Sequence, residues 1–126
     1  MTFFFDNNIS PKLVGILQLL DVDAKHLREE FPSDTEDANW IPLVGARDWV
    51  VVTADKRIRR NPAEIAALRQ NHVTALFLRD AFLKKRLWEQ AEWLIKHWRT
   101  IEQEAQSLRQ GTCAILRENG RLEIMR

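Results

Sequence analysis

The stretch WVVVTAD, residues 49–55, decides the fold. Its centre, residues 50–53, is a continuous β-branched run of the kind found in strands buried on both faces of a parallel sheet. The acid Asp55 follows closely. The opening stretch FFFDNN, residues 3–8, has the same form, because three phenylalanines run directly into Asp6. Both stretches predict a buried strand with a carboxylate at its carboxyl end, where ligands bind in open α/β sheets.

Helical and extended patterns alternate around these two strands. The expected elements are a strand at 2–6, a helix that starts at Ser10 and Pro11 and ends near Asp21, a weak strand at 24–28, a helix over about 39–48, the strand at 49–53, a helix at 63–71 capped by Asn61 and Pro62, and a strand at 72–78. This order predicts an α/β fold with a mostly parallel sheet and helices on both faces.

The C-terminal third carries two further signals. An apolar stripe of helical spacing predicts a long helix over about 83–108. The tail predicts a hairpin over about 111–126, turning at Asn119–Gly120. With no internal repeat or linker, residues 1–126 are expected to form a single domain.

Composition limits the class of protein. The single cysteine, Cys113, excludes an intramolecular disulfide framework and favours a reducing compartment, so we expect a cytoplasmic protein. No apolar stretch is long enough to span a bilayer, so no membrane partner is expected. The net charge of +1 does not by itself indicate a nucleic-acid binder, but basic clusters lie at 56–60 and 84–86.

Three acids should meet at one edge of the sheet. A crossover helix runs antiparallel to its strands, so its N-terminus lies where the preceding strand ends. Asp6 and Asp55 follow strands, and Asp37 precedes a helix. Carboxylates brought together repel one another unless a cation neutralises them, and hard oxygen ligands favour Mg²⁺ or Mn²⁺. Asn8, in the turn beyond Asp6, either supports a ligand or caps the backbone.

The order of these motifs resembles a known family. DNNI at 6–9, TEDANWI at 35–41 and VVVTADKRI at 50–58 are similar to the PIN-like domain, in the short branch found among toxins of toxin–antitoxin pairs. The resemblance covers roughly residues 2–80. It implies a three-layer α/β/α PIN-like fold with a central, mostly parallel sheet.

The resemblance also implies an activity, that of a Mg²⁺- or Mn²⁺-dependent endoribonuclease. Catalysis and metal binding would fall to Asp6, Asp37 and Asp55, with Asn8 and Thr53 in support. The chain departs from the longer members of the family at one point, because the helical acid between the first and third motifs is absent. Only Asp34 and Glu36 lie near enough in sequence to replace it.

The remaining candidates are basic or aromatic. Lys56 and Arg57 follow the proposed site directly, so we expect them to contact RNA phosphates. His26 either has a structural or surface role, or acts as a proton donor or a phosphate contact. On the long helix, Trp98 should be buried, whereas Trp88 and Trp93 lie off the apolar stripe and could face a partner.

The expected partners are therefore an RNA substrate, an antitoxin protein and a second copy of the chain in a homodimer. An alternative hypothesis is a PIN-like module with impaired catalysis that binds or regulates a partner. The missing helical acid motivates this second hypothesis. A phosphate-accepting receiver domain fits less well, because the first strand supplies one acid where that class needs two.

Overall fold

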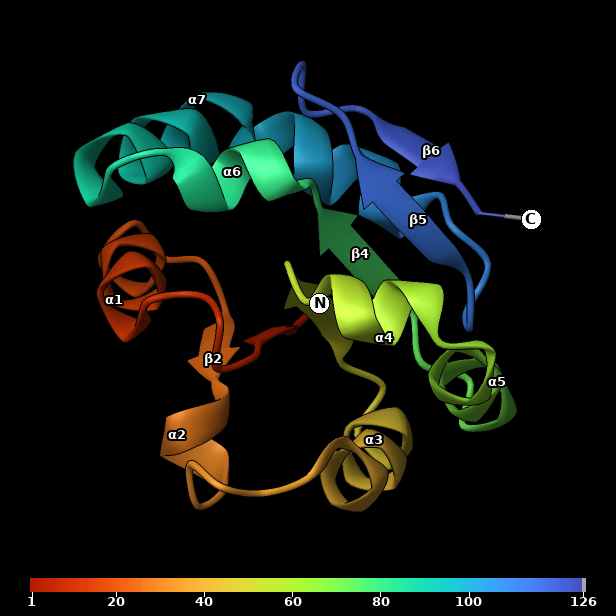
Figure 1. Ribbon diagram of the computed structural model, residues 1–126. Coiled ribbons are helices and arrows are strands. Elements are labelled where there is room, and N and C mark those ends of the chain that lie inside the picture. The colour runs from red at the N-terminus through yellow and green to blue at the C-terminus, as the bar shows by residue number, and fades with distance from the viewer. Residues whose placement is uncertain (126) are drawn as a thin grey trace.

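The computed structural model describes residues 1–125, and within them one six-stranded sheet forms the centre (Figure 1). The strand order is β2-β1-β3-β4-β5-β6. The strands are β1 (Phe3–Phe5), β2 (Ala24–His26), β3 (Val50–Thr53), β4 (Ala75–Leu78), β5 (Cys113–Leu116) and β6 (Leu122–Ile124). All neighbours pair in parallel except β5 and β6, which form the antiparallel hairpin. The predicted mostly parallel sheet is confirmed.

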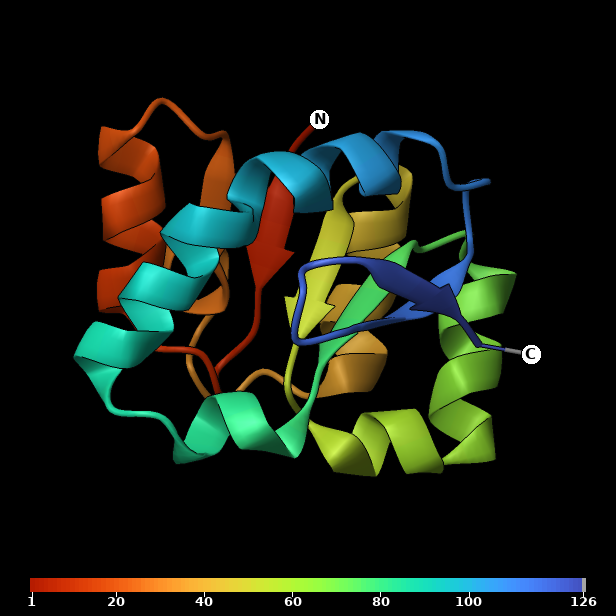
Figure 2. The ribbon, with the colours of Figure 1, turned by 90° about the horizontal axis from the view of Figure 1, so that it is seen from above.

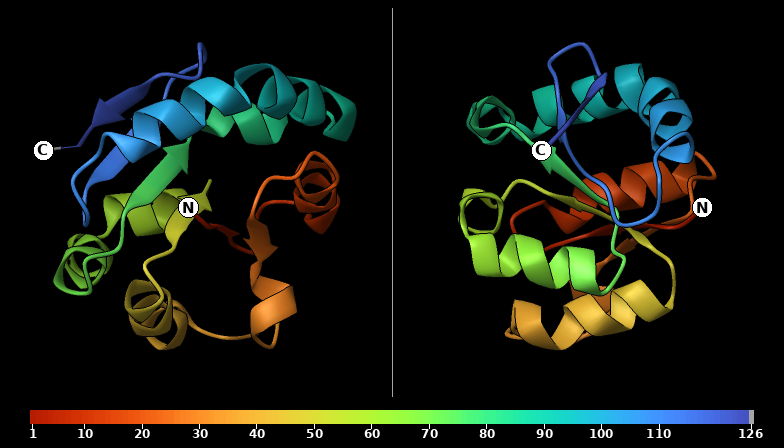
Figure 3. Two further views of the ribbon diagram at one scale, coloured as in Figure 1. Left: turned by 180° about the vertical axis from the view of Figure 1, so that it is seen from behind. Right: turned by 90° about the vertical axis from the view of Figure 1, so that its right-hand side faces the viewer.

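Helices cover both faces of the sheet, as the two views in Figure 3 show. One face packs against α1 (Pro11–Leu19) and α7 (Leu87–Gln106), and the other against α3 (Asp37–Ala46) and α5 (Pro62–Gln70). The phenylalanine run explains this arrangement, because successive side chains of a strand point to opposite faces. Phe3 and Phe5 enter the first core, and Phe4 enters the second. The predicted three-layer α/β/α architecture is therefore correct.

Three short helices were not expected from the sequence. They are α2 (Leu27–Glu30), α4 (Lys56–Arg60) and α6 (Asp80–Lys84). Seen from above, α4 and α6 lie along the edge where the parallel strands end (Figure 2). Both therefore lie at the edge where the sequence predicts that the three acids meet.

The long helix predicted over 83–108 is broken. Lys85 and Arg86 have extended backbone, and α7 begins only at Leu87. Glu89 caps this start, since its carboxylate accepts a hydrogen bond from the Arg86 backbone N–H at 3.0 Å. Because of this cap, α7 starts about one turn later than the apolar stripe suggested.

The remaining boundaries shift by a few residues. The strand expected at 72–78 begins at Ala75, because His72 adopts a left-handed backbone with φ of 56° that ends the turn after α5. The C-terminal hairpin is confirmed up to Met125, and Arg126 lies outside the described residues. Within residues 1–125, none of the helices has the length and apolar character needed to cross a membrane.

Candidate functional site

The three predicted acids lie on one cavity at the carboxyl edge of the sheet. Asp6 follows β1 and Asp55 follows β3, and these two strands are paired neighbours. Asp37 is the first residue of α3. All three line a cavity of about 310 Å³, which we call the acid cavity, together with Asn8, Thr35 and Arg57 among others. The expected convergence follows from strand pairing and from the position of a helix start.

Thr53 connects the first and last of these acids. Its hydroxyl donates a hydrogen bond of 2.5 Å to Oδ2 of Asp6 and accepts one of 3.0 Å from the backbone N–H of Asp55. Asn8 adds a second link, because its Oδ1 accepts from the backbone N–H of Ala54 at 3.3 Å. Thr53 and Asn8 therefore hold the ends of β1 and β3 together, as supporting residues would.

Asp6 is the most buried of the acids, with 5% of its surface exposed. Burial raises its pKa from 3.8 to about 7, and the nearby charges of Asp55 and Asp37 act in the same direction. Its Oδ1 atom is buried and, within residues 1–125, has no hydrogen-bond partner. A buried carboxylate oxygen without a partner is costly unless a cation or a proton satisfies it.

The other two acids are already engaged by side chains of the protein. Asp37 accepts a hydrogen bond of 3.0 Å from the indole of Trp40, and partial burial raises its pKa. Asp55 caps α4 by accepting from the backbone N–H of Arg57 at 2.9 Å, and it also pairs with the Arg57 guanidinium at 3.3 Å. The guanidinium thus supplies the positive charge at Asp55.

A fourth acid was missed in the sequence. Glu64 lies in the first turn of α5 and shares a cavity with Asp37 and Asp55. Partial burial raises its pKa, and the charges of Asp37 and Asp55 raise it further. The signal was available, because α5 starts at the same edge of the sheet and the placement argument used for Asp37 applies equally to Glu64.

The structure places the two expected substitutes for the missing helical acid farther from the site centre. Asp34 and Glu36 share a cavity with Asp37 and Glu64, but they do not line the cavities that contain Asp55. Glu64 lines cavities with both Asp37 and Asp55. It is thus better placed than Asp34 or Glu36 to complete the acid group.

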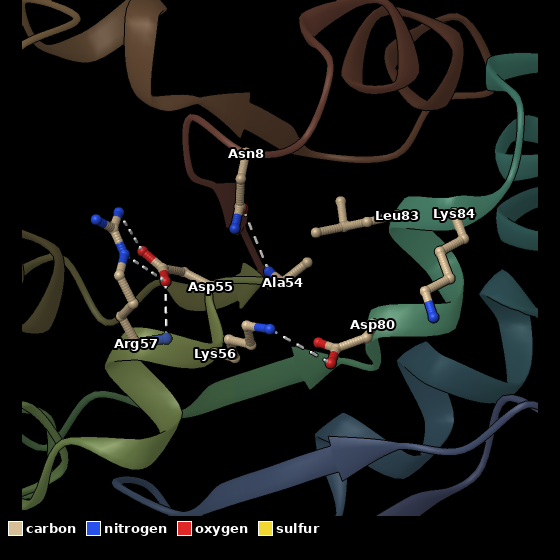
Figure 4. Close-up of a pocket in the computed structure, with 8 residues that line it drawn as sticks. All are labelled: Asn8, Ala54, Asp55, Lys56, Arg57, Asp80, Leu83 and Lys84. Carbon is tan, nitrogen blue, oxygen red and sulfur yellow. Dashed lines mark hydrogen bonds and ion pairs between the residues drawn. The ribbon is translucent and has the colours of Figure 1, made fainter.

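A second cavity opens beside the acid cavity, between α4 and α6 (Figure 4). We call it the basic pocket, because Lys56, Arg57 and Lys84 line it. Asn8, Asp55 and Arg57 line both cavities, so the two are adjacent. Both predicted RNA-binding residues, Lys56 and Arg57, therefore lie next to the acids.

The remaining candidates have structural roles. His26 is fully buried, its Nε2 lies 2.7 Å from the carbonyl of Ile9, and its Nδ1 accepts from the backbone of Arg28. Trp98 is buried as predicted. Trp93 packs edge-on against Phe82, and its indole donates to the carbonyl of Glu118, so it faces the protein itself. Trp88, at 77% exposure, remains open to solvent.

A metal ion would be held by the acid cavity. Within residues 1–125, no three acidic, histidine or cysteine side chains are already arranged to hold a metal. The donors nevertheless suit one, because carboxylate oxygens are the ligands preferred by Mg²⁺ and Mn²⁺, and Oδ1 of Asp6 is buried without a partner. Such an ion would take over the charge now supplied by Arg57, whose side chain is 90% exposed and free to move away.

Comparison with known proteins gives one positive result. No curated protein and no solved structure matches the chain. A family model described as a PIN-like domain matches residues 1–80 and so includes all four acids described above. This is a nuclease-type fold, and the region from α6 to the C-terminal hairpin lies almost wholly outside the match. The match extends over more than half of the chain, and the chain therefore belongs to the PIN-like domain family.

Proposed function

We propose that the protein is a metal-dependent endoribonuclease. The observation that carries the proposal is the meeting of Asp6, Asp37 and Asp55 on one cavity, where a buried oxygen of Asp6 lacks a partner. The basic residues beside this cavity support a substrate with a phosphate backbone.

The residues have distinct roles in the proposed reaction. Asp6, Asp37 and Asp55 hold Mg²⁺ or Mn²⁺, and Glu64 is the nearest further acid. When bound, the ion lowers the pKa of a water molecule and offsets charge that develops on the phosphate. Thr53 fixes the orientation of Asp6 through its 2.5 Å hydrogen bond, and Asn8 fixes the strand end beside it.

Substrate binding depends on the basic residues. Lys56 and Arg57 neutralise RNA phosphates on either side of the cut. In the free protein the guanidinium of Arg57 pairs with Asp55. When a metal ion binds Asp55 in its place, Arg57 can turn to an RNA phosphate. The biological role that we propose is that of a toxin in a toxin–antitoxin pair. It rests on the resemblance of the three motifs, as does the antitoxin partner. The homodimer rests instead on the exposed apolar side chains of α7, such as Trp88 and Ile95.

A second function has its own supporting observation. In residues 1–125 the acids are not arranged as a ready metal site, and Arg57 and Trp40 occupy two of them. A domain that keeps this state would bind a partner without cutting RNA. Metal binding distinguishes the two functions, because only the nuclease needs it.

The deciding experiment is incubation of a mixed RNA pool with purified protein in Mn²⁺. A chelated sample and the variants Asp6→Asn and Asp55→Asn are run beside it. The nuclease proposal expects cleavage that needs the metal and both acids. Folded protein that cuts no RNA class and does not bind Mn²⁺ would favour the binding module.

A further inference from the structure

The basic pocket has a volume that suits one nucleotide. Its volume is about 470 Å³, which falls within the roughly 300–1,000 Å³ typical of small-molecule sites. A bare phosphate would leave most of it empty. The pocket is built by α4 and by α6, which lies at the limit of the family match.

Two cations are available in this pocket. Lys56 pairs with Asp80 at 4.0 Å, and both side chains are about half exposed, so the pair is weak and easily exchanged for a phosphate. No ion pair formed within residues 1–125 involves Lys84. The next lysine, Lys85, instead binds Glu118 at 3.0 Å and does not line the pocket.

The opposite side of the pocket is apolar. Leu83 projects from α6 toward Asn8 and Ala54 (Figure 4), and 43% of its surface is exposed. A large aliphatic side chain exposed inside a charged pocket needs an apolar group to cover it. The faces of all four bases are such groups, so this contact would not select a base.

Asn8, Asp55 and Arg57 line both this pocket and the acid cavity, so the two lie side by side. A polymer whose scissile phosphate lies at the acids would therefore place its neighbouring nucleotide against α6. We propose that the basic pocket binds one nucleotide of single-stranded RNA next to the cut, with its phosphate held by Lys56, which leaves Asp80, and by Lys84, and with its base on Leu83. The proposal rests on the ribonuclease function and assigns to α6 a substrate role.

The test measures binding and cleavage separately. Binding of a fluorescein-labelled single-stranded RNA hexamer of mixed sequence is followed by fluorescence anisotropy in chelator, where no cleavage occurs. KM and kcat are then measured in Mn²⁺ on a longer RNA. The variants are Lys84→Ala and Leu83→Ser, with Lys85→Ala as the matched control. Circular dichroism confirms that each variant is folded.

We expect Lys84→Ala to weaken binding and raise KM about 5- to 10-fold, and Leu83→Ser about 3- to 5-fold. The value of kcat should change less than about 2-fold, because this nucleotide is not the reacting group. Lys85→Ala should leave Kd and KM within about 2-fold of the parent protein.

Two results overturn the proposal in distinguishable ways. If the parent protein cuts RNA and both variants behave like Lys85→Ala, the nucleotide site is wrong and the nuclease function stands. If the parent protein neither cuts nor binds RNA, both fail together.

Discussion

The acid cavity and the basic pocket lie side by side at one edge of the sheet, but they are built differently. The acid cavity is made by residues at the ends of buried strands and at a helix start, and Asp6 is 5% exposed. The basic pocket is made mainly by the two short helices α4 and α6, and its ion-paired side chains Lys56 and Asp80 are about half exposed.

This difference separates two kinds of electrostatics. In the acid cavity, burial shifts pKa values and leaves an oxygen of Asp6 without a partner, so each group has a large effect. In the basic pocket, solvent screens the charges and each contact contributes little. We therefore expect changes in the first region to affect the chemistry and changes in the second to affect affinity.

The largest expected effect is a difference in kcat between variants of two aspartates, Asp55 and Asp80, which follow the neighbouring strands β3 and β4. Asp55→Asn removes a metal-holding charge and should lower kcat by roughly 10²- to 10³-fold. Asp80→Asn, in the basic pocket, releases Lys56 and should leave kcat within about 3-fold. Steady-state cleavage of one RNA by both variants checks this. Equal losses in the two variants would contradict the proposed division between chemistry and affinity.

The next effect concerns the acid that completes the cavity. Glu64→Gln should weaken Mn²⁺ binding and cleavage by roughly 10- to 100-fold, the range found when a supporting metal-site residue is lost. Glu36→Gln is the matched control, since Glu36 does not share a cavity with Asp55. Calorimetric titration with Mn²⁺ compares the two. A larger loss of Mn²⁺ affinity in the Glu36 variant would show that Glu36, at the start of α3, is the fourth acid of the site instead of Glu64.

A third prediction follows from the burial of Asp6. Its pKa of about 7 in the folded protein exceeds the ordinary 3.8, so the folded state holds the proton more tightly than the unfolded state. This contribution to metal-free stability is complete below about pH 4 and is lost as the pH rises through about 7. Asp6→Asn should therefore raise the free energy of unfolding at pH 8 by about 2 kcal/mol while abolishing cleavage.

Urea unfolding in chelator at pH 5 and pH 8 measures this effect. Asp80→Asn serves as a control, because the Asp80 side chain is 43% exposed. Mn²⁺ must displace the proton of Asp6, so its affinity should rise with pH up to about 7. An Asp6→Asn protein with unchanged stability at pH 8 would show that the carboxylate is better solvated than its burial indicates.

The smallest effect tests Arg57 as a competitor of the metal. Arg57→Ala frees the carboxylate of Asp55 and should tighten Mn²⁺ binding by at most about 5-fold, because solvent screens an ion pair whose arginine side chain is 90% exposed. The same variant should raise KM for RNA. Arg59→Ala, on the same helix, controls for loss of charge. Weaker Mn²⁺ binding in the Arg57 variant would instead make Arg57 part of the support for Asp55.

The sequence alone determined most of the central sheet and the three acids. Buried parallel strands have continuous apolar sequences. The topology requires that the carboxyl ends of these strands and the N-termini of the helices that follow them lie at one edge of the sheet. For this reason Asp6, Asp37 and Asp55 could be placed from FFFDNN, TEDANWI and VVVTAD. Glu64 was open to the same argument.

Only the tertiary structure decided which short helices and side-chain contacts complete this edge of the sheet. The short helices α4 and α6 carry weak periodic signals, and the break at Lys85 and Arg86 depends on one capping interaction. The structural role of His26 depends on a carbonyl contributed by Ile9, far away in sequence. The pairing of Arg57 with Asp55 and the unpartnered oxygen of Asp6 likewise depend on burial and side-chain packing, which arise only when distant segments meet.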